Sequence, residues 1–234
     1  METLQSYDEK KAIVLGLDLG QKNDYSAICA IEIRQKYSPV KSPPYTVNTR
    51  YGEYELDGEP FYLVKHLHRW PLGTPYPDIV KDTGNLMSKL KDREQVGVTL
   101  IIDSTGVGNP VFDMFREARI QATGISIHGG SSVTREGKIF HVPKRDLVAV
   151  LVKLYQSDRI TVSGKLPEHK TLNAELLNFR VKISDSGHDT YSAWRERDHD
   201  DIVLSVAVAC WVAEKQKKNI LWKHVSKEKL GISV

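Results

Sequence analysis

Three apolar segments, far apart in the chain, each meet an acid at one end. Residues 11–19 and 96–102 are β-prone runs, and Asp18 and Asp103 stand where these runs stop. Residues 202–213 are almost entirely apolar and directly follow Asp201. Runs of this kind suit strands covered on both faces and a buried helix. A carboxylate beside them is costly unless a cation lies nearby, so the fold must bring these acids to a positive charge.

The hydrophobic pattern predicts an α/β fold built on a mixed sheet. We expect strands over 11–19, 25–34, 61–70, 96–102, 124–128 and 159–162, and helices over 77–92, 109–118, 143–156, 167–179 and from Asp200 or Asp201 onward. Early antiparallel strands followed by alternating strands and helices give a mixed sheet with helices on its faces.

Four other stretches have weaker patterns. Residues 35–60 indicate an irregular excursion or a long extra hairpin, and residues 129–140 a polar loop. Two short β-prone pieces, 181–183 and 190–194, flank turn residues and predict an extra β-hairpin. The basic residues from 215 onward indicate a tail.

Composition is typical of one globular domain. The chain has 234 residues, of which 40% are hydrophobic and 27% charged, and we expect one domain over 1–234 with its core at about 11–214 and a tail at 215–234. A net charge of +3 is compatible with nucleic acid without requiring it. Cys29 and Cys210 lie in apolar stretches, which favours buried thiols in a reducing compartment. Without a signal peptide or a run of ~20 apolar residues, we expect a cytoplasmic protein with no membrane contact.

The three acids together suggest a metal site. Two Mg²⁺ or Mn²⁺ ions about 3.5–4 Å apart can activate a water and neutralise a leaving oxygen in phosphodiester hydrolysis, and such ions take oxygen ligands. Asp18 and Asp103 would converge if their strands are neighbours, and Asp201 would join them from the helix. Asp200 or Asp198 could reach the second ion or a water. Singly, each acid is equally well explained by a turn or a helix cap.

Four motifs, taken in order, resemble the nuclease domain of phage large terminases, the DNA-packaging enzymes with a ribonuclease H-like fold. They are Gly-Leu-Asp-Leu-Gly at 16–20 with Asp-Tyr-Ser-Ala at 24–27, Ile-Asp-Ser-Thr-Gly-Val-Gly at 102–108, Val-Pro-Lys-Arg-Asp-Leu-Val at 142–148, and His-Asp-Asp-Ile-Val-Leu at 199–204. The chain has no Gly-x-x-x-x-Gly-Lys-[Ser/Thr] motif. The resemblance therefore covers the nuclease without the packaging ATPase, in an isolated domain or a stand-alone relative.

The resemblance implies roles for particular residues. Asp18, Asp103 and Asp201 would bind Mg²⁺ or Mn²⁺, and Asp200 would bind the second ion or a water. Lys144 could stabilise charge at the scissile phosphate, although a plain surface lysine is the alternative. The implied activity is cleavage of double-stranded DNA concatemers during viral genome packaging in the host cytoplasm. The implied partners are a packaging ATPase domain, the small terminase and the portal protein.

Three other functions remain open from the sequence. A Holliday-junction resolvase or transposase-like nuclease would use the same fold, with Asp198 as an added candidate ligand. Gly-Leu-Asp-Leu-Gly is also similar to the phosphate loop of actin-like proteins and sugar kinases. In a non-catalytic binding domain, the acids would never meet.

Overall fold

The computed structural model describes residues 8–20, 24–39, 54–106, 109–184 and 200–222. The strands within these ranges are β1 (Asp8–Asp18), β2 (Ala27–Pro39), β3 (Tyr54–Arg69), β4 (Val98–Asp103), β5 (Ala122–His128), β6 (Thr134–Glu136), β7 (Ile139–Pro143) and β8 (Ile160–Val162). The helices are α1 (Tyr76–Glu94), α2 (Asn109–Glu117), α3 (Lys144–Gln156), α4 (His169–Ser184) and α5 (Asp201–Trp222).

The strands form one mixed sheet in the order β6-β7-β5-β4-β1-β2-β3-β8. The first three strands pair antiparallel with one another, whereas β4 is parallel to β1, β5 to β4, and β7 to β5. This arrangement confirms the predicted α/β fold with early antiparallel and later parallel strands. The β1 strand lies near the middle of the sheet, as its apolar sequence requires, because both of its faces are covered.

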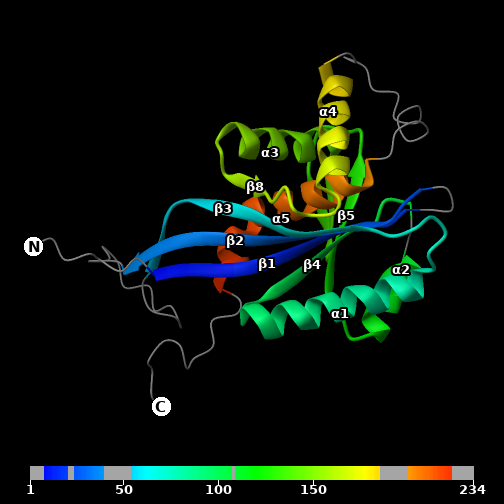
Figure 1. Cartoon of the computed structure of the whole chain (residues 1–234), viewed down its shortest axis with the longest axis horizontal. Helices are drawn as coiled ribbons and strands as arrows, with labels where there is room; N and C mark the ends of the chain where they lie inside the picture. Colours follow the sequence, from blue (N-terminus) through cyan, green and yellow to red (C-terminus); the bar gives the residue numbers. More distant parts are fainter. Residues whose placement is uncertain (1–7, 21–23, 40–53, 107–108, 185–199, 223–234) are drawn as a thin grey trace, which may run out of the picture.

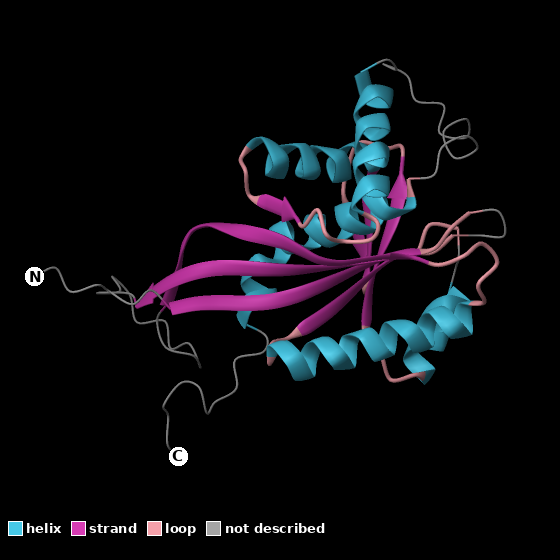
Figure 2. Ribbon diagram, viewed as in Figure 1, coloured by secondary structure: helices cyan, strands magenta, loops and turns pink. Residues whose placement is uncertain are grey.

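Helices cover both faces of the sheet. Figures 1 and 2 show α3, α4 and α5 on one face and α1 and α2 on the other. Alternate residues of β1 enter two different cores, Val14 facing α5 while Ile13 and Leu15 join the core beneath α1. The alternation follows from the two-residue period of a strand.

The α5 helix packs unusually close to β1. A Cβ atom added at Gly16 would lie 1.9 Å from the carbonyl oxygen of Ser205 and 2.9 Å from Cβ of Ala209. The buried Cys29 thiol on β2 donates a hydrogen bond to the same Ser205 carbonyl, at 3.3 Å. Gly16 thus lets the beginning of α5 rest directly on β1, two residues from the end of that strand.

A buried ion pair fixes the other half of α5. Glu214 lies 3.0 Å from the guanidinium of Arg159, next to β8, and also accepts a hydrogen bond from the Tyr62 hydroxyl of β3. These contacts join α5 to the sheet far along the helix from Asp201.

Most predicted elements are present, and two predictions are wrong. Residues 129–140 include β6 and the beginning of β7 instead of one polar loop. Residues 181–183 belong to α4 and not to a hairpin strand, because continuation of a helix overrides their β-propensity; residues 190–194 lie outside the described part of the chain. At the two ends of the range 35–60, Lys36 pairs with Asp57 and Pro39 with Tyr54, as the hairpin alternative predicts, while residues 40–53 lie outside the described part of the chain.

Cys29 and Cys210 are buried free thiols, as predicted. Among the helices that the structure describes, none combines the length and apolarity needed to cross a bilayer.

Candidate metal centre

Two strand ends and one helix start meet at one edge of the sheet, the edge formed by the carboxyl ends of β1 and β4. Asp18 is the last residue of β1 and Asp103 the last of β4, and the two are direct partners in the parallel β1–β4 register. Asp201 is the first residue of α5, which packs across β1, β2 and β4. The structure therefore brings the three predicted acids together from remote parts of the sequence.

All three carboxyl groups are buried. Asp18, Asp103 and Asp201 are 8%, 3% and 1% exposed. The pKa of Asp18 is raised well above its usual value, first by burial and then by the charges of Asp103, Asp201, Asp200 and Asp24. These acids are thus close enough to repel one another, and ionising all of them together is unfavourable without a cation.

Protein groups hold several of the acid oxygens. Asp103 Oδ1 accepts hydrogen bonds from the Thr105 backbone N–H, at 2.8 Å, and from the Thr105 hydroxyl. Burial raises the pKa of Asp201, and a hydrogen bond with Asp24 raises it further. Thr105 is itself fixed, because its hydroxyl oxygen accepts the backbone N–H of Ile127 from β5 at 2.7 Å. The turn after β4 is therefore tied to the neighbouring strand.

Lys144 brings a positive charge to this edge. It is the first residue of α3, and its Nζ lies 3.1 Å from Oδ2 of Asp200. Burial lowers the pKa of Lys144, whereas Asp200, Asp18 and Asp103 act to raise it. The side chain is only 19% exposed, which favours a place in the site over the surface-lysine alternative.

The donor set fits a divalent cation, although the ligands are not already gathered. No group of three or more Asp, Glu, His or Cys side chains within the described ranges is positioned as a metal cluster. The acids interact through their charges, and their side chains would have to move for their oxygens to share an ion. Buried carboxylate oxygens are the ligands that Mg²⁺ and Mn²⁺ prefer, and a cation would offset the repulsion that raises the pKa of Asp18.

Two acids at the site were not predicted. Asp24 hydrogen-bonds with Asp201, and its signal in the sequence is its place in the motif at 24–27. Glu175, from the middle of α4, accepts the backbone N–H of Val203 at 2.8 Å; nothing in its local helical sequence marks it. Asp198 and His199 lie outside the described residues.

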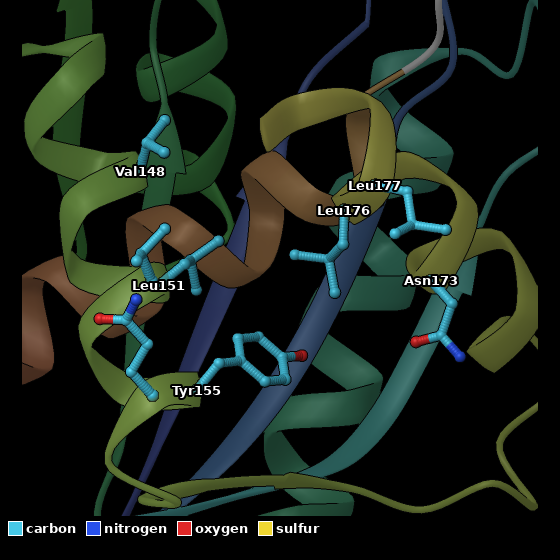
Figure 3. A pocket seen from close by; sticks show the side chains of 8 residues that line it. Val148, Leu151, Tyr155, Asn173, Leu176 and Leu177 are labelled. Atoms are coloured by element: carbon cyan, nitrogen blue, oxygen red, sulfur yellow. The ribbon is translucent and has the colours of Figure 1, made fainter. Parts of the chain in front are cut away.

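An apolar groove elsewhere is separate from the acids. It lies between α3 and α4, has a volume of about 480 Å³, and Figure 3 shows Leu151 and Tyr155 of α3 opposite Leu176 and Leu177 of α4. None of the four predicted metal ligands lines it. Its apolar walls do not suit a phosphate or a hard cation, so the candidate centre is the edge with the acids.

Comparison with known proteins finds solved structures of limited similarity. No family model and no curated protein matches the chain. A Mn-soaked structure of the human cytomegalovirus terminase nuclease domain is similar with a TM-score of 0.46 and 12% identity, over 90% of this chain and 86% of that chain. Another structure of that domain gives 0.45 and 12%, with the same coverage. At 12% identity, the likeness to these structures concerns the arrangement of the chain alone and assigns it no activity.

The raised pKa of Asp18 predicts a pH-dependent stability in EDTA. Its carboxyl keeps a proton in the folded chain that the unfolded chain releases above a pH of about 4. Stability should therefore fall as pH rises from that value toward the folded-state pKa. Asp18→Asn removes the ionising group, so the variant should melt above wild type at pH 8, by roughly 3 °C per kcal/mol of relieved repulsion. The difference should shrink toward pH 5.

Thermal melts in EDTA across this pH range provide the check. Identical melting temperatures for wild type and variant at pH 8 would show that the charge of Asp18 does not destabilise the metal-free chain.

Proposed function

We propose that the chain is a metal-dependent endonuclease that hydrolyses phosphodiester bonds of double-stranded DNA. One observation carries the proposal: Asp18 and Asp103 are buried register partners at the edge of the sheet where Asp201 begins α5. Buried acids that repel one another are expensive to maintain, and perturbed acids of this kind cluster at functional sites. Binding of a divalent cation explains why these acids are buried together, whereas folding alone does not.

The residues divide the work between binding and charge stabilisation. Asp18, Asp103 and Asp201 would hold the metal, with Asp200 at the second ion or a bound water. When bound, Mg²⁺ or Mn²⁺ supplies a water of lowered pKa and neutralises charge on the phosphate. Lys144 reaches the same edge from α3 and is held by Asp200 at 3.1 Å. From there its ammonium group can stabilise the extra negative charge on a phosphate oxygen in the transition state.

The biological role we propose is the cutting of viral DNA concatemers during packaging, in the host cytoplasm. The motifs at 16–20, 102–108, 142–148 and 199–204 support this role through their resemblance to large terminases. A packaging ATPase domain, the small terminase and the portal protein would then be its partners. We expect little sequence preference, because no element of the described chain is marked as a reader of base edges.

Cleavage assays test the function directly. The purified chain is incubated with supercoiled plasmid, linear duplex and a four-way DNA junction, each in Mg²⁺, in Mn²⁺ and in EDTA. We expect nicking or linearisation of duplex DNA in at least one metal and none in EDTA. A folded chain that cuts none of these substrates in either metal contradicts the proposal.

The same substrates and a separate ATPase assay distinguish two alternatives. Strong preference for the junction would favour a resolvase of the same fold. ATP hydrolysis by the purified chain would instead favour the actin-like or sugar-kinase class.

A further inference from the structure

We propose that Glu175 is a positioning residue that fixes the first turn of α5 and so determines where Asp200 and Asp201 stand relative to Asp18 and Asp103. The inference rests on the proposed metal site and extends it to a residue of α4. Glu175 touches neither a substrate nor the acids of β1 and β4. It acts through the backbone of α5.

Glu175 caps α5 from a different helix. Its side chain is 5% exposed, and its Oε2 accepts the Val203 N–H at 2.8 Å. The carbonyl of Asp200 accepts the Leu204 N–H at 2.9 Å, so Asp200 occupies the N-cap position. The first N–H groups of a helix need acceptors from outside it, and a capping side chain usually supplies one. Here Glu175 does so, while Asp200 Oδ2 lies against Lys144.

A second series of contacts connects Glu175 to Asp201 through other residues. Glu175 Oε1 lies 3.6 Å from a guanidinium nitrogen of Arg69, at the end of β3. The Arg69 guanidinium lies 4.4 Å from the centre of the Tyr25 ring. Tyr25 donates its backbone N–H to Asp24 Oδ1 at 3.1 Å, and Asp24 accepts a hydrogen bond from the protonated carboxyl of Asp201. Glu175 is therefore connected to the start of α5 both directly and through Tyr25 and Asp24, which precede β2.

This arrangement has a specific consequence for metal binding. Asp18 and Asp103 belong to neighbouring strands of a rigid sheet, whereas Asp200 and Asp201 move with the start of α5. Ligand groups must be held within about 0.5 Å of their productive positions. Loss of the Glu175 contacts should loosen the acids of α5 against those of the sheet. The affinity for metal should fall, while DNA binding that depends on surface charge should not.

The chain contains a matched control for this test. Glu214 also lies on the interface of α5, is 13% exposed, and forms an ion pair with a buried arginine, Arg159. It anchors α5 far from Asp201. Glu214→Gln should lower the melting temperature without changing metal affinity, and this separates general loosening of α5 from displacement of its first turn.

The experiment compares Glu175→Ala, Glu175→Gln and Glu214→Gln with wild type. Mn²⁺ dissociation constants are measured by calorimetry without DNA, and half-maximal Mn²⁺ for cleavage and DNA affinity are measured separately. We expect Glu175→Ala to weaken Mn²⁺ binding about tenfold or more, the loss typical when a supporting group of a metal site is removed. Glu175→Gln keeps a carbonyl acceptor for the Val203 N–H and should recover part of the affinity. DNA affinity should stay within twofold.

Several results would overturn the inference. One is an Mn²⁺ affinity equal to that of wild type in both Glu175 variants. Another is a loss of Mn²⁺ affinity in Glu214→Gln as large as the loss in Glu175→Ala. If Glu175→Ala does not fold, Glu175→Gln against Glu214→Gln carries the same comparison. A wild-type chain that binds Mn²⁺ but cuts no DNA contradicts the nuclease proposal alone, because the calorimetric comparison still decides the role of Glu175. A chain that binds no Mn²⁺ overturns both.

Discussion

We expect Asp103→Asn and Asp18→Asn each to abolish metal-dependent cleavage of duplex DNA while the chain stays folded. Each substitution replaces a charged oxygen with an amide nitrogen that repels a cation, at the two positions where β1 and β4 end side by side. Both side chains are buried, so a water cannot readily take over the lost ligand. Mutation of a group that only supports a metal ligand typically lowers activity by up to about 100-fold. Loss of a ligand itself should cost more, so the rate should fall by more than ~100-fold.

Asp113→Asn is the matched control for this experiment. Asp113 lies on α2, is 49% exposed, and pairs with Arg116 on the surface. The same chemical change there should leave cleavage within twofold, since exposed ion pairs contribute little. Far-ultraviolet circular dichroism and thermal melts confirm that all variants are folded. Cleavage at the wild-type rate by either Asp18→Asn or Asp103→Asn would remove these carboxylates from the mechanism.

Among these substitutions, Gly16→Ala should lower the free energy of unfolding most. The added methyl carbon would lie 1.9 Å from the Ser205 carbonyl oxygen, far inside van der Waals contact, and that oxygen belongs to the backbone of α5. A backbone atom cannot turn aside like a flexible side chain, so α5 must move away from β1. We expect a loss of about 3 kcal/mol or more in the free energy of unfolding, which corresponds to roughly 10 °C in melting temperature.

Gly164→Ala provides the comparison. A Cβ atom at Gly164 would meet nothing within 4 Å, so this variant should melt within about 2 °C of wild type. If Gly16→Ala folds, it should also bind Mn²⁺ more weakly, because moving α5 separates Asp201 from Asp18. A wild-type melting temperature for Gly16→Ala would show that α5 does not rest on β1 as closely as the structure indicates.

Local sequence was enough to predict, to within one residue, where β1 and β4 end and where α5 begins. In each case a long apolar run stops at an acid, and burial of the run on both faces leaves the acid at its boundary. The pairing of Asp18 with Asp103 could not be derived in the same way. It depends on β1 and β4 being neighbours in parallel register, which is a tertiary property, and the sequence showed only that such a pairing would be useful.

The missed features share a physical cause. The three-residue β6 strand gains its order from pairing with β7, which in turn pairs with β5, and so short a strand has no periodicity of its own. Glu175 belongs to an ordinary helical pattern, and its importance comes from a contact 28 residues away along the chain. Such roles follow from packing between elements and leave no local signal.

The most direct test of the account is diffraction from crystals soaked in Mn²⁺, with data collected to locate manganese by its anomalous signal. We predict strong anomalous density between the carboxylates of Asp18, Asp103 and Asp201, which disappears in Asp103→Asn crystals soaked in the same way. Well-ordered acids without manganese between them at saturating Mn²⁺ would contradict the metal centre, and with it the proposed nuclease activity.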